Sequence, residues 1–467
     1  MYLRKLQRFL AAMAAVAMLA ACSDDDDNAR LTLEGTTLFV EGWGVTATMH
    51  FTSADLRSIS LNSVPKGWTI EADLPTGTLT ATSPAEADRE QSDRSGTVSV
   101  IGYTMSGKSI IHKLQVGVVS KEDLVSRQAN CMVLTSPYTV YAFDPTLRGE
   151  SGEKLATAEV RIVWQTAKEL VRELRFDGMT ATFYIDGEKD DVVPGNALLG
   201  AYDRSGKLLT TWHLWLTNAA DYGEQTYAGG RTFLTLNLGA ARNANATPDE
   251  VLGSFGCFYQ WGRKEPFVGP AAYDAADGAD AKMYDANGET LYLTYEASSP
   301  ETGTAEYAAA HPTTYILGTE ASGYDWLHTP AAEPLWSGER KTANDPCPKG
   351  WRMPSERDFE ALRIVDAAAG KESQYGWYLT DGTATAYYPG AGFRTYLTGV
   401  VQNMYNPVSG VEVPRPWTGD YWTAGTQGRL SSAFVFWFDA ADPARSGTTP
   451  SEWRRRADGM QIRCVRE

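Results

Sequence analysis

Four acidic side chains near the end of the chain have the type and spacing to do chemistry together. Asp439, Asp442, Glu452 and Asp458 are close in sequence. Two carboxylates can act as a general acid and base, and several carboxylate oxygens can bind Ca²⁺. No second motif accompanies this cluster, and acidic residues between strands are most often solvated. We therefore predict solvent-exposed loop charges here, in preference to a carboxylate pair or a calcium site.

Common catalytic and metal-binding motifs do not occur in the sequence. Neither G-x-S-x-G nor H-E-x-x-H is present, and no histidine spacing suits a metal. The histidines are His50, His112, His213, His311 and His328. Trp212, His213 and Trp215 could form a binding surface, but a buried strand pair fits better because large aromatic side chains usually bury most of their area. The sequence predicts no catalytic residue, no cofactor and no metal.

The cysteines give a more specific constraint. Apart from Cys22 there are four, Cys131, Cys257, Cys347 and Cys464. In a compartment that is not strongly reducing, four cysteines allow three sets of disulfide pairings. Cys131 and Cys257 lie in different predicted modules, and a cysteine with apolar neighbours is commonly a buried free thiol. The residues alone leave the pairing open.

The start of the chain predicts export and lipidation. The basic residues Arg4, Lys5 and Arg8 precede the apolar run Phe9–Ala20. This run is too short for a permanent membrane-spanning helix and is typical of a signal peptide. The leader ends in Leu-Ala-Ala-Cys, a lipobox, so we expect cleavage directly before Cys22 and a lipid on its thiol. An ordinary cleavage site with an incidental cysteine fits the pattern less well. More than one acyl chain would make the anchor durable.

An acidic run, Ser-Asp-Asp-Asp-Asp-Asn, follows at residues 23–28. A block of like charge stays solvated and extended, so this run could serve as a spacer. Its position beside the lipid cysteine resembles the acidic export signal of surface lipoproteins in Bacteroidetes-type bacteria. That resemblance implies an outer-membrane protein exposed on the cell surface.

Composition narrows the partners and the fold class. With 58 acidic and 42 basic side chains the net charge is -16 at pH 7, which disfavours nucleic acid and anionic lipid head groups as partners. Membrane attachment must therefore come from the lipid on Cys22. A chain of 467 residues is too long for one ordinary domain. Its 43 glycines and 11% aromatic residues favour β-rich modules.

The first half of the chain has the alternation of β-sandwiches. Apolar and polar residues alternate over 98–100 and 114–118 on either side of a turn at 106–107, which predicts a hairpin with one buried face. The same alternation recurs over 160–164 and 181–185. We predict two successive immunoglobulin-like sandwiches that act as spacers.

A short helix is predicted near the start of the last segment. Ser355 can cap it, and Asp358 completes a capping box. Phe359, Leu362 and Val365 then repeat every three residues on one face. This face is expected to pack on a core.

Five motifs follow one another in the second half. They are Phe255–Phe267 (FGCFYQWGRKEPF), Cys347–Ser355 (CPKGWRMPS), Tyr387–Arg394 (YYPGAGFR), Gly419–Gly425 (GDYWTAG) and Arg456–Glu467 (RADGMQIRCVRE). Their order resembles the Fibrobacter succinogenes major paralogous domain. The motifs are also similar to those of C-type-lectin-like folds, which include the formylglycine-generating enzymes. The resemblance covers residues 227–467 and implies an α+β third domain.

This resemblance implies further site assignments. The long bridge of lectin-like folds would join Cys347 to Cys464. Loops carry the binding sites of such folds, so the irregular stretch 266–346 and residues 396–416 are where a ligand face is expected. Tyr421 and Trp422 are its candidate ligand-binding residues.

Two activities found in similar folds are not expected. Formylglycine-generating enzymes use a pair of reactive cysteines near the end of the fold, and only Cys464 lies there. Calcium-dependent lectins use Glu-Pro-Asn and Trp-Asn-Asp, and neither tripeptide occurs; Glu265-Pro266-Phe267 has the wrong third residue. The run 454–456 of three arginines could attract an acidic ligand, although a solvated, protease-sensitive loop fits it better.

Together these features predict a mainly β, multidomain surface lipoprotein in which two immunoglobulin-like β-sandwiches precede an α+β C-type-lectin-like domain. The predicted parts are a leader (1–21), an anchor and acidic linker (22–30), sandwiches at 31–120 and 121–226, and the lectin-like domain (227–467). We expect this domain to bind an extracellular glycan or protein in adhesion or nutrient capture, without catalysis. The alternative is an accessory or tip subunit of a surface assembly, which should have unpaired sheet edges or a donor strand. An enzyme related to the formylglycine-generating or hydrolytic families is less expected.

Overall fold

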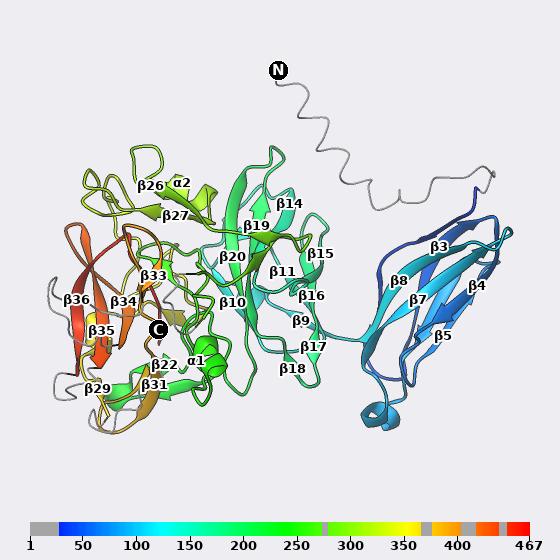
Figure 1. Cartoon of the computed structure of the whole chain (residues 1–467), viewed down its shortest axis with the longest axis horizontal. Helices are drawn as coiled ribbons and strands as arrows, with labels where there is room; N and C mark the ends of the chain where they lie inside the picture. Colours follow the sequence, from blue (N-terminus) through cyan, green and yellow to red (C-terminus); the bar gives the residue numbers. More distant parts are fainter. Residues whose placement is uncertain (1–27, 273–278, 366–375, 403–416, 439–445) are drawn as a thin grey trace, which may run out of the picture. The chain divides into compact units, whose positions relative to one another are not determined.

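The computed structural model describes residues 28–272, 279–365, 376–402, 417–438 and 446–467 (Figure 1). The leader with Cys22, the acidic run up to residue 27, Asp439 and Asp442 lie outside these residues. The described chain is mainly β and separates into two compact units, Met1–Val119 and Ser120–Glu467. Among the helices of the described ranges, none is long and apolar enough to span a membrane.

The N-terminal unit is a sandwich of two four-stranded sheets, with strand orders β1-β3-β6-β5 and β2-β8-β7-β4. The bounds are β1 Arg30–Leu33, β2 Thr37–Val40, β3 Thr46–Ala54, β4 Leu56–Asn62, β5 Thr69–Asp73, β6 Thr78–Thr82, η2 Glu86–Gln91, β7 Ser95–Thr104 and β8 Ser109–Val118. The predicted hairpin is β7–β8, in which Val98 lies opposite Leu114. Both side chains are fully buried in the core of the sandwich. The predicted alternation is confirmed here, because one face of each strand meets the other sheet.

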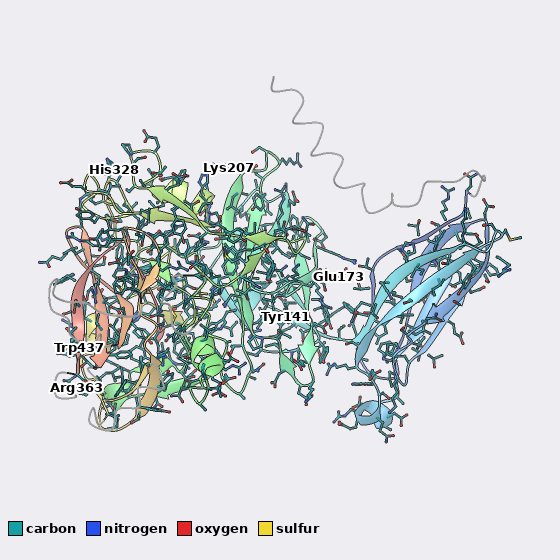
Figure 2. All side chains as sticks on the ribbon, in the orientation of Figure 1. Tyr141, Glu173, Lys207, His328, Arg363 and Trp437 are labelled. Atoms are coloured by element: carbon teal, nitrogen blue, oxygen red, sulfur yellow. A yellow bond between two sulfur atoms is a disulfide. The ribbon has the colours of Figure 1, made fainter. Side chains whose placement is uncertain are left out.

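A second sandwich opens the C-terminal unit. A six-stranded sheet in the order β10-β20-β19-β14-β24-β25 shares a core with a four-stranded sheet in the order β15-β16-β11-β9. The bounds are β9 Ser120–Asp123, η3 Val125–Arg127, β10 Cys131–Leu134, β11 Thr139–Phe143, β12 Leu147–Arg148, β13 Glu153–Lys154, β14 Glu159–Gln165, β15 Arg172–Phe176, β16 Ala181–Ile185, β17 Gly187–Glu188, β18 Asp191–Val192, β19 Gly195–Tyr202 and β20 Leu208–Leu216. Tyr141, labelled in Figure 2, lies in this core and donates its hydroxyl proton to Ser136 O at 3.0 Å. The fold is therefore multidomain and sandwich-based, as predicted.

The six-stranded sheet continues into the region after residue 226. Strand β24 pairs with β14 through Tyr284 and Gln165. Trp215 packs in one core with residues of the last hundred positions, and Asn196 Nδ2 donates to Gly239 O at 2.9 Å. The predicted division at residue 226 therefore runs through a continuous core, and the second sandwich and the C-terminal region form one compact unit.

The remainder of this unit consists of short strands joined by long connections. Its strands are β21 Glu224–Thr226, β22 Thr232–Leu234, β23 Tyr259–Gln260, β24 Met283–Tyr284, β25 Thr290–Leu291, β26 Thr294–Ala297, β27 Thr314–Leu317, β28 Trp351–Arg352, β29 Arg363–Ile364, β30 Gly376–Thr380, β31 Thr385–Pro389, β32 Phe393–Arg394, β33 Val401–Gln402, β34 Trp417–Gln427, β35 Leu430–Phe438, β36 Gly447–Arg455, β37 Gly459–Met460 and β38 Val465–Arg466. Its helical segments are η4 Ala228–Gly230, α1 Pro248–Ser254, α2 Ala305–Ala310 and α3 Glu356–Phe359. The longest strands, β34 to β36, form one antiparallel sheet.

Helix α3 has the predicted start but not the predicted length. Asp358 Oδ2 accepts hydrogen bonds from the backbone N–H of Ser355 at 2.7 Å and from its hydroxyl at 2.8 Å. The helix ends at Phe359, so the threefold repeat does not continue on one face. Phe359 and Leu362 are buried, whereas Val365 is exposed.

The disulfide joins Cys347 to Cys464, with Cα atoms 5.9 Å apart. It connects the segment before β28 to the segment before β38, and these two strands also pair in one sheet. In the chain-entropy model a bridge closing so long a loop contributes about 4–5 kcal/mol to the free energy of unfolding. The bridge thus fixes the two ends of the last segment in one core.

Candidate functional site

The two residues predicted to bind a ligand are core residues, and that prediction is wrong. Tyr421 and Trp422 have no exposed surface. The Tyr421 hydroxyl donates to Pro389 O at 2.9 Å, and Trp422 Nε1 donates to Tyr259 O at 2.7 Å. Strand β34 is covered on both faces, because Tyr421 packs in one core and Trp422 in another. No polar atom of either ring is left for a ligand.

A different group of residues meets between described parts of the two predicted loop regions and the end of β36; residues 403–416 of the second region lie outside the described residues. Tyr324 comes from the loop after β27, Tyr396 from the turn after β32, and Arg455 from the end of β36. The two tyrosine rings lie edge to face with centroids 5.2 Å apart, and the Arg455 guanidinium lies 5.1 Å from the Tyr324 ring centroid. All three side chains are half-buried. We call Tyr324, Tyr396 and Arg455 the Tyr324 platform.

The loop that carries Tyr324 is tightly built. Tyr324 has φ 63°, a left-handed conformation that costs a non-glycine residue free energy. Its N–H donates to Thr319 O at 2.7 Å, and the Ser322 hydroxyl donates to Asp325 O at 2.6 Å. The N–H of Gly318 donates to Tyr396 O at 2.8 Å, which ties the two loops together. These bonds hold Tyr324 in its strained conformation.

Two arginine side chains stabilise the same loop, one through hydrogen bonds and the other through an ion pair. Arg429 Nη1 donates to Ser322 O at 2.6 Å and to His328 O at 3.2 Å; His328 is labelled in Figure 2. Arg456 Nη1 lies 3.6 Å from the Asp325 carboxylate. Burial raises the pKa of Asp325 to about 6. The loop is therefore anchored by the half-buried Arg429 and by the buried pair of Arg456 and Asp325.

The arginine run 454–456 is not the solvated loop that the sequence predicted. Arg456 is 6% exposed, and its guanidinium lies 4.6 Å from the Trp261 ring centroid. Arg454 Nη2 lies 2.8 Å from Asp420, which has no exposed surface. Only Arg455 of the three belongs to the platform. Arg454 and Arg455 are neighbours in β36, so their side chains point to opposite faces of the strand, and Arg456 follows directly after its end.

The prediction that Asp458 is a solvated loop charge is also wrong, because this residue is buried. It is 3% exposed, and its Oδ1 accepts a hydrogen bond from the Tyr396 N–H at 2.8 Å. Burial raises the pKa of Asp458 to about 7, although Arg454 acts in the opposite direction. Glu452 lies 3.5 Å from Arg454. Asp458 therefore positions the backbone of Tyr396 in place of forming a carboxylate pair with Glu452.

Two cysteines and one histidine of the sequence analysis lie buried in the C-terminal unit. Cys131 and Cys257 are buried free thiols, and burial raises the pKa of Cys257 to about 12, so its thiolate is scarce. His213 shares a 2.8 Å hydrogen bond with Asn196 Oδ1, and burial lowers its pKa to about 3. Trp212, His213 and Trp215 are each at most 1% exposed, which confirms the prediction of a buried strand. Across the residues that the structure describes, no three His, Cys, Asp or Glu side chains are placed to hold a metal ion.

The platform has the chemistry of a recognition surface. Tyrosine offers a rigid, amphipathic ring at low entropic cost, and a guanidinium pairs with carboxylate or sulfate groups. The sequence analysis proposed two loop regions for a ligand face but did not single out Tyr324, because a tyrosine in an irregular stretch has no periodic pattern to mark it. The glycine before it, Gly323, was the only local signal of an unusual backbone; it also has positive φ.

Comparison with known proteins gives no relative by sequence. No family model matches the chain, and no curated protein matches it. Among solved structures, the D00-D0 domain of intimin is 15% identical and aligns over 40% of this chain and 96% of its own, with a TM-score of 0.17. A Bacteroides ovatus protein, SGBP-B of a mixed-linkage glucan utilization locus, solved with a mixed-linkage heptasaccharide, is 13% identical over 41% of this chain and 46% of its own, with a TM-score of 0.13. At such TM-scores these alignments carry no argument about fold or function.

Proposed function

We propose that this chain is a lipid-anchored surface protein whose C-terminal region binds an extracellular ligand, a glycan or a protein, at the Tyr324 platform. Cys22 would carry the lipid and hold the chain at the outer membrane. Residues 227–467 would be a lectin-like domain similar to the Fibrobacter succinogenes major paralogous domain. The chain would act by binding, in adhesion or nutrient capture, without catalysis or cofactor.

The observation that supports the binding site is the strained Tyr324 held beside Tyr396 and Arg455. Backbone strain in a folded protein persists only where surrounding contacts maintain it, and it concentrates at ligand sites. Three contacts maintain it here: the Tyr324 N–H bond to Thr319, the Arg429 bonds, and the link from Gly318 to Tyr396. A surface already ordered in this way loses little conformational entropy when a ligand binds.

The residue types favour an acidic ligand within this class. Arg455 adds a positive charge next to the Tyr324 ring, on a chain whose net charge is -16. A sugar ring can pack on a tyrosine while its carboxylate or sulfate pairs with the guanidinium. An acidic peptide would contact the same tyrosine ring and guanidinium. The binding experiment therefore includes both acidic glycans and proteins.

A binding panel tests this proposal. The chain without its leader is applied to neutral glycans, uronate-containing and sulfated glycans, and extracellular-matrix proteins, with calcium and with chelator. We expect binding to at least one acidic ligand, unchanged by chelator and reduced about tenfold or more in Tyr324→Ala and Arg455→Ala. Tyr292→Ala and Arg340→Ala are matched controls, since both residues are exposed and lie outside the platform. A blank panel, or equal loss in the controls, contradicts the proposal.

Anchoring needs a separate experiment, because it rests on the sequence alone. We expect Cys22→Ala to release the chain from the membrane fraction and to abolish metabolic labelling with palmitate. Protease treatment of intact cells should remove the C-terminal region from the wild-type chain. Protection of this region in intact cells would contradict surface exposure.

A further inference from the structure

The N-terminal sandwich covers its core more completely on one side than on the other. On the side of β1 and β2, Leu31, Leu38 and Val40 are at most 7% exposed, and Leu33 is half-buried. On the side of β4 and β5, the apolar residues Ile59, Leu61, Ile70 and Ala72 are only half-buried, although they pack against the same core. The core is therefore covered less completely on the second side.

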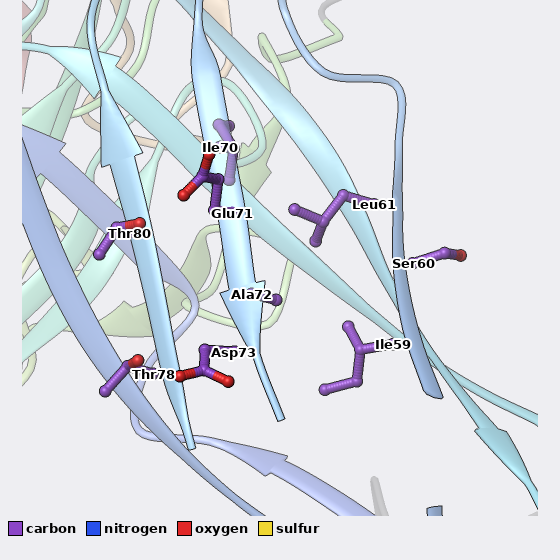
Figure 3. Close-up of a pocket in the computed structure, with 9 residues that line it drawn as sticks. All are labelled: Ile59, Ser60, Leu61, Ile70, Glu71, Ala72, Asp73, Thr78 and Thr80. Carbon is purple, nitrogen blue, oxygen red and sulfur yellow. The ribbon is translucent and has the colours of Figure 1, made fainter. Parts of the chain in front are cut away.

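A groove follows this less covered side. Its volume is about 660 Å³, and residues of β4, β5 and β6 line it. Figure 3 shows Ile59 and Leu61 directed from β4 toward β5, and Ser60 directed away. The apolar side chains of the two strands therefore face each other across the groove.

Both strands that border the groove are sheet edges. Strand β5 pairs with β6 alone and β4 with β7 alone among the strands of the described chain. An edge strand presents a row of backbone N–H and C=O groups that another strand can bind. Natural edges are commonly blocked by proline, lysine or an inward-pointing charge. Strand β5 (Thr-Ile-Glu-Ala-Asp) contains no proline or lysine, and its inward-facing residues are Ile70 and Ala72.

The outward residues of β5 define the charge of the occupant. Glu71 and Asp73 are exposed and alternate with Ile70 and Ala72. On β6, Thr80 and Thr78 lie opposite them, and no lining residue is basic. A strand added along β5 would place its outward side chains next to the two carboxylates and its inward side chains in the groove. Pairing of β5 with β5 of a second copy would instead bring Glu71 and Asp73 of both copies together, which repels.

We propose that this groove accepts an extended segment of a partner protein, which pairs with the free edge of β5. The segment carries apolar side chains at alternate positions, which fill the groove against Leu61 and Ile70, and Lys or Arg between them, opposite Glu71 and Asp73. This goes beyond ligand binding by the C-terminal region and gives the N-terminal sandwich a partner of its own. The mode of recognition is β-strand addition, with backbone hydrogen bonds for affinity and alternate side chains for specificity.

Defined peptides test this assignment on the chain without its leader. The probe is a capped peptide of about nine residues that alternates valine and lysine, long enough to cover the five residues of β5. One control has the same composition with all valines in one block, and another alternates valine and glutamate. We expect the valine–lysine probe alone to bind, and to slow amide hydrogen exchange in β4 and β5 but not in the C-terminal unit.

A charge swap gives a readout that a folding defect cannot imitate. Glu71→Lys/Asp73→Lys changes two exposed residues, so the sandwich should fold. We expect the variant to bind the valine–lysine probe about tenfold more weakly and to gain affinity for the valine–glutamate peptide. Absence of binding at about 1 mM probe, protection elsewhere in the chain, equal binding of the blocked peptide, or no response to the swap overturns the proposal. Dimerisation of the chain through this edge in sedimentation experiments would also overturn it.

Discussion

The N-terminal sandwich has one core between its two sheets, whereas β34 of the C-terminal unit contributes side chains to two different cores. Val98 and Val100 of β7 pack in this core with no exposed surface, whereas the adjacent Ser99 and Ile101 are slightly exposed and lie outside it. In β34, Tyr421 and the adjacent Trp422 enter different cores. Alternation therefore identifies the core of the sandwich, but in the C-terminal unit it cannot separate ligand-binding aromatic residues from structural ones.

The two units also differ in whether their buried polar residues are charged. In the N-terminal sandwich, every buried polar residue is uncharged within the described sequence. The C-terminal unit encloses Asp325, Asp420, Asp458, Arg394 and Arg463. Burial of charge costs free energy unless each group is paired or hydrogen-bonded. We infer that stability in the C-terminal unit depends on individual polar contacts, whereas the sandwich depends on apolar burial.

Loss of the disulfide should give the largest difference between the units. Cys347→Ala/Cys464→Ala should lower the free energy of unfolding of the C-terminal unit by about 2–5 kcal/mol and leave the sandwich unchanged. Denaturant titration, followed by hydrogen exchange and mass spectrometry, resolves the two units. Cys257→Ala is the control, since it removes a buried sulfur without removing a bridge. Equal loss in both units would contradict the independence of the two cores.

Truncation of Trp422 tests whether this residue stabilises the core, as its burial indicates, or binds a ligand. Because the ring is fully buried and donates to Tyr259 O, Trp422→Ala should cost about 3–5 kcal/mol of unfolding free energy. Chemical denaturation provides the measurement. Tyr292→Ala, at a residue 80% exposed, should change stability by less than about 0.5 kcal/mol. A stable Trp422→Ala protein that has lost ligand binding would restore the original prediction.

Asp458 should make the stability of the C-terminal unit depend on pH. Its folded pKa of about 7 lies above the usual value for an unfolded aspartate, so the folded state binds the proton more tightly. The resulting stabilisation is complete below about pH 4 and is lost as pH rises through 7. Asp458→Asn should flatten this dependence, by an amount on the order of 1–4 kcal/mol between pH 4 and 8. Thermal unfolding over that pH range measures it, and an unchanged profile in the variant would count against the burial argument.

Backbone strain at Tyr324 should give the smallest effect. Glycine tolerates φ 63° without a Cβ penalty, so Tyr324→Gly should be more stable than Tyr324→Ala by about 1 kcal/mol. Both variants lose the ring contact with Tyr396, so their difference isolates the strain. Equal denaturation midpoints for the two would show that the loop stores no strain.

Sequence reasoning predicted the parts of the fold that depend on local pattern. The β7–β8 hairpin follows from alternation, and the Ser355–Asp358 capping box follows from side-chain spacing. The Cys347–Cys464 bridge came from resemblance, since spacing alone allowed other pairings. The Tyr324 platform could not be predicted, because its three residues come from separate segments and meet only after the C-terminal unit has folded. Burial of Asp458 could not be predicted for the same reason, because it contacts residues that are distant in sequence, such as Tyr396.

Footprinting of tyrosines in the presence of ligand tests the central claim most directly. The chain without its leader is exposed to hydroxyl radicals, with and without the best ligand from the binding panel, and oxidation is read by mass spectrometry. We predict that ligand protects Tyr324 and Tyr396 while Tyr292 reacts unchanged. Protection of Tyr292 or other distant surface residues, with Tyr324 equally reactive in both samples, would contradict a ligand site at the platform.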